Sequence, residues 1–513
     1  MKTTKTKIFT ALLIIFGLTT AIQAQGFSDS ANQWNIPVIG SYDYRVYDDF
    51  HSVLDFNGDG KPDLIDSLDD VSGTVFLNGT QKYWKVYLNT GLGFSPTAIE
   101  WNIPVIGSYD YKVSDQYHQV LDFDGDGKPD LIDTLDDLGS GVFLNGTQKY
   151  WKVYLNTGSG FSPTAIEWNI PAIGSYDYLF YDFYHAVVDF NGDGKPDLID
   201  SLDDVSGNVF LNGTQKYWKV YLNTGSGFSL TAIEWNIPVI GSYDWRVYDD
   251  FHSVLDFNGD DKPDLIDSLD DLGSGVFLNG TQKYWKVYLN TGSGFSATAV
   301  DWNIPAIGSY DYKVYDTYHS VIDFDADGKP DLIDSLDDLG SGVFLNGTQK
   351  YWKVYLNTGS GFSPAFTQWN MPVIGSYDYN VYDNYHSVLD FDGDEKPDLI
   401  DSLDDATGNT FLNGTQKYWK VYLNIGSNLA TDFFEKDNDI AIYPNPTRDF
   451  LNVSVIQEID SVVIYNALGQ EVMAQSLNAN EVKIDVSDLQ QGIYILKVFN
   501  NKGEAFMKRF IKK

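Results

Sequence analysis

The nine residues 55–63, Asp-Phe-Asn-Gly-Asp-Gly-Lys-Pro-Asp, place oxygen-bearing side chains at regular intervals. Positions 1, 3, 5 and 9 of this stretch are carboxylates or a carboxamide, position 7 offers its backbone carbonyl, and position 6 is a glycine that permits a sharp turn. Oxygen ligands at this spacing are those that a hard cation such as Ca²⁺ requires. The stretch is therefore a candidate cation-binding loop.

The same pattern occurs six times at a constant step of 67 residues. This repetition makes the prediction of cation-binding loops much stronger than a single copy would. The later copies begin at Asp122, Asp189, Asp256, Asp323 and Asp390. Up to six structural Ca²⁺ sites are predicted, with the side chains at positions 1, 3, 5 and 9 and the carbonyl at position 7 as ligands. The predicted ligands are Asp55, Asn57, Asp59, Lys61, Asp63, Asp122, Asp124, Asp126, Lys128, Asp130, Asp189, Asn191, Asp193, Lys195, Asp197, Asp256, Asn258, Asp260, Lys262, Asp264, Asp323, Asp325, Asp327, Lys329, Asp331, Asp390, Asp392, Asp394, Lys396 and Asp398.

The six loops differ at the positions where glycine permits a left-handed backbone. Asp261 and Glu395 replace the glycine at position 6 in the fourth and sixth loops, and Ala326 stands at position 4 of the fifth. Because aspartate tolerates a left-handed conformation better than glutamate does, the loop beginning at Asp390 is predicted to be the weakest site. The loop beginning at Asp256 is the next weakest.

The segments on both sides of each loop are β-type and contain no amphipathic helix, so each loop is predicted to join two strands. Four strands are expected in the first unit, at about 51–56, 63–68, 82–89 and 98–103. The stretch Trp34-Asn-Ile-Pro also returns once in every unit. A period longer than those of helical solenoids, filled with short strands and turns, favours the blades of a β-propeller.

The two ends of the repeat region indicate how the blades close into a ring. Residues 26–34 match 93–101, whereas the sixth unit stops near residue 427 without an equivalent outer strand. An N-terminal strand that completes the last blade would remove the exposed sheet edges. The fold class predicted is all-β, a six-bladed calcium-binding β-propeller closed by an N-terminal strand. An open stack of the same units is the alternative.

These motifs resemble the FG-GAP or VCBS repeats of integrin-like β-propellers. The resemblance rests on residues 53–64, Val-Leu-Asp-Phe-Asn-Gly-Asp-Gly-Lys-Pro-Asp-Leu, and on 86–95, and it covers roughly 26–428. It implies a calcium-stabilised propeller with one blade per repeat. Related propellers serve in adhesion, as lectins, in toxins and in some polysaccharide lyases, so the resemblance does not define one activity.

Composition and the N-terminus point to an exported protein. The chain has 513 residues, no cysteine and a formal net charge of -38, which argues against a nucleic-acid partner because few cations would neutralise phosphates. Residues 1–24 have basic residues, a short apolar run and small residues near the end, as in a secretory signal peptide. The mature chain is expected to start near Gln25, and no transmembrane segment is expected.

The repeat period ends at residue 427, and 428–439 is a polar, acidic stretch expected to be a linker. Residues 440–513 resemble the type A sorting domain of the type IX secretion system, through Ile442-Tyr-Pro-Asn-Pro, 463–469 and the basic end at 508–513. Alternating strands and turns predict a small C-terminal β-sandwich. The resemblance implies the type IX secretion machinery as a partner and a secreted or cell-surface protein.

The face opposite the cation loops is the predicted ligand-binding face of the 25–427 propeller, because binding residues often lie on loops held by a rigid scaffold. Residue 45 varies among the units, which indicates either diversification for binding or simple solvent exposure. The candidate ligand-binding residues are Tyr42, Tyr44, Arg45, Tyr109, Tyr111, Tyr176, Tyr178, Tyr243, Trp245, Tyr310, Tyr312, Tyr377 and Tyr379.

Two other repeated residue types have a chemical and a structural interpretation. The six histidines occupy one repeat position, that of His51. A ring of six imidazoles could bind a transition metal. The favoured interpretation is structural, with each histidine making one hydrogen bond inside its own blade. Tryptophans of the Trp34 and Trp84 types are predicted to lie in the core between blades, rather than to stack on sugars.

The function predicted from the sequence is a binding or adhesion module for an extracellular glycan or protein, built on a monomeric propeller. The alternatives are a polysaccharide lyase or hydrolase on the same propeller, or a structural surface-coat protein. An enzyme is expected to break the symmetry with catalytic residues in one blade, and no unit does so clearly. No nucleophile elbow, phosphate-binding loop, dinucleotide fingerprint or zinc-protease motif occurs.

Overall fold

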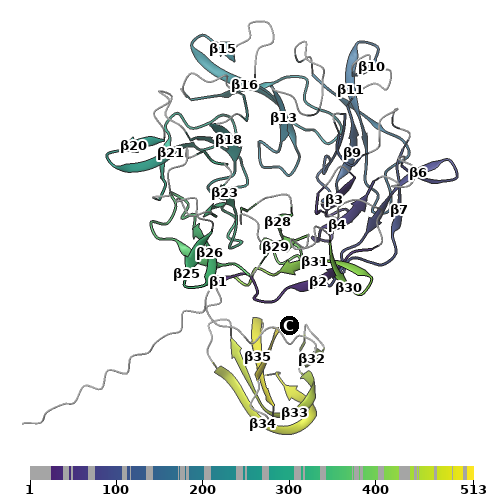
Figure 1. The fold of residues 1–513 in the computed structure, drawn as a ribbon, viewed down its shortest axis with the longest axis vertical. Helices are drawn as coiled ribbons and strands as arrows, with labels where there is room; N and C mark the ends of the chain where they lie inside the picture. The colour runs from purple at the N-terminus through teal and green to yellow at the C-terminus, as the bar shows by residue number, and fades with distance from the viewer. Residues whose placement is uncertain are drawn as a thin grey trace, which may run out of the picture. The chain divides into compact units, whose positions relative to one another are not determined.

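Six similar β-sheets surround a common centre in the computed structural model of the chain (Figure 1). Residues 24–426 form one compact unit, and the strands after residue 427 belong to another. The structure describes residues 25–37, 45–47, 50–67, 75–104, 106, 112–115, 117–134, 142–171, 173, 180, 184–201, 209–238, 246–248, 251–268, 276–305, 313–315, 318–335, 343–372, 374, 380–381, 385–402, 410–426, 440–443, 447–448, 450–466, 471–487, 489–490, 492–500 and 505–513.

Each blade is an antiparallel sheet of four strands, which we call A to D from the centre outward, and a short hairpin strand that precedes the C strand. In the first blade, β3 pairs with β4, β4 with β6, and β6 with β7. The A strands are β3 (His51–Leu54), β8 (His118–Leu121), β13 (His185–Val188), β18 (His252–Leu255), β23 (His319–Ile322) and β28 (His386–Leu389). The B strands are β4 (Asp63–Asp66), β9 (Asp130–Asp133), β14 (Asp197–Asp200), β19 (Asp264–Asp267), β24 (Asp331–Asp334) and β29 (Asp398–Asp401).

The outer half of each blade contains the two remaining strands. The C strands are β6 (Gln81–Tyr87), β11 (Gln148–Tyr154), β16 (Gln215–Tyr221), β21 (Gln282–Tyr288), β26 (Gln349–Tyr355) and β31 (Gln416–Tyr422). The D strands are β7 (Ile99–Asn102), β12 (Ile166–Asn169), β17 (Ile233–Asn236), β22 (Val300–Asn303), β27 (Thr367–Asn370) and, for the sixth blade, β2 (Asn32–Asn35). The four strands expected in each unit are therefore confirmed.

A three-residue strand that was not predicted precedes each C strand. It pairs with the C strand, as Phe76 with Tyr83 and Asn78 with Gln81. A two-residue turn connects the two strands, and its first residue, Gly79, has φ of 63°. These hairpins extend at the outside of the disc (Figure 1). The hairpin strands are β5 (Phe76–Asn78), β10 (Phe143–Asn145), β15 (Phe210–Asn212), β20 (Phe277–Asn279), β25 (Phe344–Asn346) and β30 (Phe411–Asn413).

The core consists of clusters between successive blades. Alternation along β6 places Trp84 and Val86 on one face, where they pack with Trp101 of the same blade. Leu131 and Phe161 of the second blade complete this cluster. The prediction that this face packs on the neighbouring blade is confirmed, and no blade could bury its aromatic face alone.

The N-terminal segment closes the ring, as predicted. Strand β2 pairs with β31 of the sixth blade, with Trp34 opposite Trp419. Before it, the two-residue strand β1 (Gln25–Gly26) pairs in parallel with β27 of the fifth blade. The N–H of Phe27 donates to the carbonyl of Asn370 at 3.1 Å. The first residues of the propeller therefore join its last two blades.

The C-terminal unit contains β32 (Ile440–Tyr443), β33 (Phe450–Asn466), β34 (Glu471–Asp485), β35 (Gly492–Asn500) and β36 (Ala505–Lys512). Strand β33 pairs with three others, and its register shifts between Ser454 and Ser461. Its buried side chains include Val453, Val462 and Ile464. The C-terminal domain, expected to be a small β-sandwich, is all-β, and its five strands are hydrogen-bonded into one connected sheet. Nowhere in the described ranges is there a helix of the length and apolarity that a bilayer span requires.

Ring closure predicts that Trp34→Ala destabilises the propeller as much as Trp101→Ala does. Both side chains are fully buried, at 1% and 0% exposure, although one lies in the strand that closes the ring. Each substitution should lower the free energy of unfolding by about 3–5 kcal/mol, as measured by denaturant titration. Leu92→Ala, at a side chain that is 84% exposed, is the control and should change it by less than about 0.5 kcal/mol. A Trp34→Ala effect as small as the control would contradict closure.

Candidate metal centre

Each predicted cation loop joins the A and B strands of a blade, as residues 55–62 do between β3 and β4. Oδ1 of Asp55 accepts hydrogen bonds from the N–H groups of Gly58 at 2.8 Å and Asp59 at 3.1 Å, and its Oδ2 accepts one from Gly60 at 2.7 Å. The loop backbone therefore curls around the carboxylate of Asp55, which accepts hydrogen bonds from its N–H groups. All the predicted ligand residues lie in these six loops, within the described part of the chain.

The carboxylate at position 9 is the most buried part of the loop. Asp63 has no exposed surface, and it accepts hydrogen bonds from Phe56 N at 3.2 Å and from Asn89 N at 2.7 Å. Burial raises the pKa of Asp63 to about 7, the two N–H donors oppose this rise, and the carboxylates of Asp59 and Asp55 add to it. The pKa rises for the same main reason to about 7 in Asp130, Asp197 and Asp264 and to about 8 in Asp331 and Asp398.

Three loops bring three aspartates together closely enough to hold a metal ion, with one oxygen of each within 4.8 Å of the others. These groups are Asp122, Asp124 and Asp130; Asp323, Asp325 and Asp331; and Asp390, Asp392 and Asp398. The other three loops have asparagine at position 3, namely Asn57, Asn191 and Asn258. They have one carboxylate fewer but still offer an oxygen there.

The position-3 oxygen supports a cation ligand in these loops. Oδ1 of Asn57, Asn191 and Asp325 is buried and has no hydrogen-bond partner among the described residues. A buried oxygen without a hydrogen-bond partner lowers the free energy of unfolding, because it has lost its hydration. A bound cation would satisfy it and would also offset the repulsion among the carboxylates. The donor set therefore fits a hard cation.

The loop backbone requires positive φ at positions 4 and 6. Gly58 and Gly60 have φ of 79° and 84° in the first loop. Where glycine is replaced, the new residue keeps the conformation, with φ of 61° at Ala326, 64° at Asp261 and 72° at Glu395. Left-handed backbone at such residues costs of order 1–2 kcal/mol, so these loops carry strain that the glycine loops avoid. This strain applies to the fourth and sixth loops, predicted to be the weakest sites, and equally to the fifth loop through Ala326.

The six histidines lie on the A strands and are buried, as the structural interpretation requires. Nε2 of His51 lies 3.7 Å from Oδ1 of Asp66, its cross-strand partner on β4. In the second blade, Nδ1 of His118 also lies 2.9 Å from Asp115. Burial and the contact with the cross-strand aspartate, which recurs in all six blades, indicate a structural role inside each blade.

The predicted ligand-binding face falls largely outside the described residues. Of its candidates, the structure describes only Arg45, whose guanidinium carbon lies 5.5 Å from the ring centre of Tyr385 in the sixth blade. The tryptophans of both repeated types are in the core, as predicted, so they offer no surface for a sugar. Those fully buried are Trp34, Trp84, Trp101, Trp151, Trp168, Trp218, Trp235, Trp285, Trp302, Trp352, Trp369 and Trp419. The remaining candidates, outside the described residues, are Tyr42, Tyr44, Tyr109, Tyr111, Tyr176, Tyr178, Tyr243, Trp245, Tyr310, Tyr312, Tyr377 and Tyr379.

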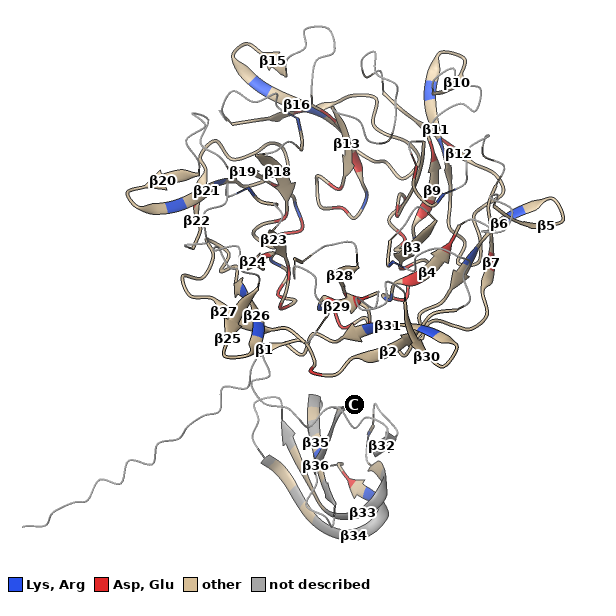
Figure 2. Ribbon diagram, in the orientation of Figure 1, with Lys and Arg blue, Asp and Glu red and all other residues tan. Residues whose placement is uncertain are grey.

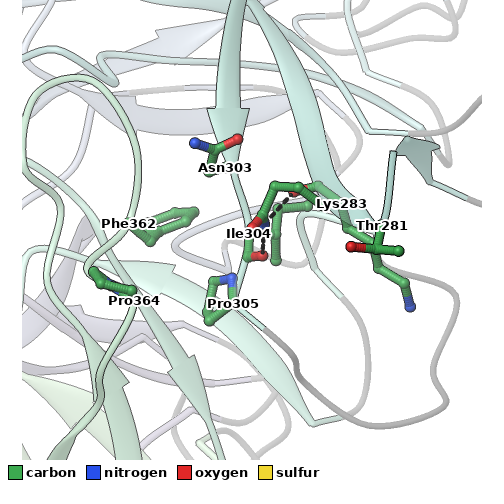
Figure 3. A pocket seen from close by; sticks show the side chains of 8 residues that line it. Thr281, Lys283, Asn303, Ile304, Pro305, Phe362 and Pro364 are labelled. Carbon is green, nitrogen blue, oxygen red and sulfur yellow. Dashed lines mark hydrogen bonds between the residues drawn. The ribbon is translucent and has the colours of Figure 1, made fainter. Parts of the chain in front are cut away.

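A surface pocket of about 410 Å³ lies where the hairpin of the fourth blade meets the fifth blade (Figure 3). Pro305, Phe362 and Pro364 provide apolar walls, and Asn303 and Thr281 provide polar groups. We call the hairpins at the outside of the disc the rim hairpins. Figure 2 shows lysines on them and acidic residues nearer the centre of the disc. The outer edge of the disc therefore offers both apolar and polar groups for contact with a ligand.

Among solved structures, three matches illustrate the likeness. They are the Photorhabdus luminescens Tc holotoxin pore (15% identity, TM-score 0.45), PorZ of the Porphyromonas gingivalis type-IX secretion system (14%, 0.28) and the extracellular domain of a putative one-component system of B. thetaiotaomicron (11%, 0.29). The matches cover 78%, 93% and 95% of this chain, which in turn spans 15%, 61% and 58% of those chains. With all TM-scores below 0.5, none of these likenesses supports a shared function.

No curated protein matches the chain. Two family models do match parts of it. Residues 122–199, which include the second and third cation loops, match the FG-GAP-like repeat, and residues 441–513 match the secretion system C-terminal sorting domain. The chain therefore carries FG-GAP-like repeat sequence in its propeller and ends in a type IX sorting domain, which directs it to the cell surface or the extracellular space.

Proposed function

We propose that this protein is a calcium-stabilised binding module, exported to act in adhesion or recognition of a protein or glycan. The calcium part rests on the loops. Their ligands are all oxygen atoms, their carboxylates crowd together, and the position-3 oxygen of several loops is buried without a partner. Oxygen-only ligands on a flexible loop suit Ca²⁺, whereas Mg²⁺ demands a stricter octahedral arrangement. Bound calcium would neutralise the repulsion near the buried position-9 carboxylate.

One observation carries the binding part of the proposal, namely the identity of the rim hairpins. Residues 76–89 have the same sequence in all six blades, whereas some exposed positions elsewhere, such as those of Leu92 and Glu100, vary among the blades. Phe76 stacks on Tyr83 at 5.7 Å, and Nζ of Lys85 lies 3.8 Å from the Phe76 ring centre, so one face of the hairpin is filled. Leu77 points to the opposite face and remains 55% exposed.

An exposed leucine at the same place in every blade gives a set of identical apolar contacts. The equivalent leucines are Leu144, Leu211, Leu278, Leu345 and Leu412, at 56–60% exposure. Individually weak contacts of this kind become strong when several engage one partner. Because sugars stack on aromatic faces and the repeated tryptophans are buried, the rim favours a protein ligand over a glycan.

The binding proposal predicts that serine at all six rim leucines lowers binding at least about 10-fold through lost avidity. The mature protein would be assayed on arrays of extracellular proteins and of glycans, with calcium and with chelator. Leu92→Ser together with Leu230→Ser is the control, because these two leucines are exposed but have no leucine equivalent in the other blades. Unchanged binding by the six-fold variant would rule out the rim, and shortened saccharide products would support an enzyme instead.

Calcium binding predicts that Asp122→Asn removes one ion from the stoichiometry measured by isothermal titration calorimetry. Asp122 accepts the backbone hydrogen bonds that shape its loop and belongs to a three-aspartate group, so its loss disables one site only. Asp29→Asn, an exposed change outside the loops, should leave the stoichiometry unchanged. An unchanged stoichiometry for Asp122→Asn would contradict the assignment of the ligands.

The raised pKa values predict that calcium stabilises the propeller more at pH 8 than at pH 5.5. Without calcium, the folded chain retains protons on Asp63 and its equivalents up to about pH 7–8, whereas the unfolded chain releases them near pH 4. These groups therefore favour folding below about pH 4, and that contribution is lost as pH rises toward 8. Calcium needs the ionised carboxylates, so its effect on Tm should grow over the same range. An equal or larger shift at pH 5.5 would contradict this account.

A further inference from the structure

The six cation loops touch one another around the centre of the propeller. A Cβ atom on Gly58 would lie 3.3 Å from the carbonyl oxygen of Gly127 and 3.0 Å from Cγ of Lys128, both in the second loop. Gly393 of the sixth loop has the same relation to Gly60 and Lys61 of the first. The loops therefore pack as neighbours, including across the point of ring closure.

A buried asparagine links each loop to the loop before it. Asn89 follows the C strand of the first blade, and its N–H donates to Oδ1 of Asp63, the position-9 carboxylate of its own loop, at 2.7 Å. Its side-chain Nδ2 donates to the carbonyl of Pro62 at 3.1 Å and to that of Phe391, in the sixth loop, at 2.9 Å. One residue thus contacts a predicted ligand in one loop and the backbone of the preceding loop.

The same linkage recurs at every junction between blades. The bonds from asparagine Nδ2 to the preceding loop are Asn156 to Phe56, Asn223 to Phe123, Asn290 to Phe190 and Asn357 to Phe257, each at 2.9 Å, and Asn424 to Phe324 at 3.1 Å. These asparagines are buried, at 3–5% exposure.

These bonds form a closed chain around the disc. The phenylalanine at position 2 donates its N–H to the position-9 carboxylate of its own loop, as Phe56 does to Asp63 at 3.2 Å. Its carbonyl accepts the bond from Asn156, whose N–H donates to Asp130 of the second loop at 2.8 Å. Carboxylate, phenylalanine peptide and asparagine therefore alternate through all six loops, and every step includes a predicted calcium ligand.

We propose that these asparagines couple the loops, so that calcium bound in one loop raises the affinity of its neighbours. The inference rests on calcium binding as proposed above. An ion that fixes Asp63 also fixes the Phe56 peptide, which positions Asn156 and through it the Asp130 carboxylate. The neighbouring loop then loses less freedom when it binds its own ion, which is positive cooperativity. Asn89 and its equivalents act as positioning residues.

Two double variants of the full mature chain separate coupled from independent sites. Asp189→Asn with Asp256→Asn disables loops three and four and leaves four loops in one unbroken run. Asp55→Asn with Asp256→Asn disables loops one and four and leaves two separate pairs. The retained loops differ only by exchanging the first for the third, and residues 55–63 and 189–197 have identical sequences.

Calcium titration by calorimetry should give four ions for both variants. The unbroken run should show the higher Hill coefficient, above 1, and a half-saturation concentration roughly 5-fold or more lower. Equal titration curves would overturn the coupling while leaving calcium binding intact. No calcium binding by the unaltered protein would instead overturn the calcium proposal itself.

A third substitution tests the asparagine directly in the variant with the unbroken run. Asn89→Ala cuts the link between loops six and one, which are both active, and should lower the Hill coefficient to that of the two separate pairs. Asn290→Ala makes the same truncation between the two disabled loops and should leave the Hill coefficient unchanged. Equal losses in both would show that the asparagine supports only the fold and would overturn the inference. Circular dichroism checks that both variants remain folded.

Discussion

A buried carboxylate at the end of every cation loop is the constraint on which this propeller depends. Asp63 and its equivalents lie at the start of the B strands, fully enclosed and close to other carboxylates of the same loop. Two backbone N–H donors compensate in part, but burial still raises the pKa to about 7. A bound cation, as proposed here, would resolve this conflict by supplying the missing positive charge.

The aromatic core imposes the second constraint. Each blade exposes one face of tryptophan and aliphatic side chains that only the next blade can cover. Such a stack has two open ends unless it closes, and closure here uses β2 as the outer strand of the sixth blade. Because the cation loops lie at the inner ends of the same sheets, the packing that closes the ring also brings neighbouring loops into contact. Core and loops therefore reinforce each other.

Much of this arrangement could be predicted because the repeat presents the same information six times. The loop pattern, the strands, the buried tryptophans and the closing strand all follow from spacing and alternation. The β5 hairpin was missed because three residues are too few for a clear period, although Asn78-Gly79 is a recognised turn signal. The Asn89 link could not be predicted, since it depends on which atoms the folded blades bring together across a distance in sequence of about 300 residues.

An anomalous difference map from crystals grown in calcium would show whether the six loops bind Ca²⁺. We expect one ion in each of the six loops, at about 2.3–2.6 Å from the oxygens of the side chains at positions 1, 3, 5 and 9 and of the carbonyl at position 7. A closed disc whose loops hold no ions at saturating calcium, with position-9 carboxylates turned away from the other ligands, would contradict this expectation.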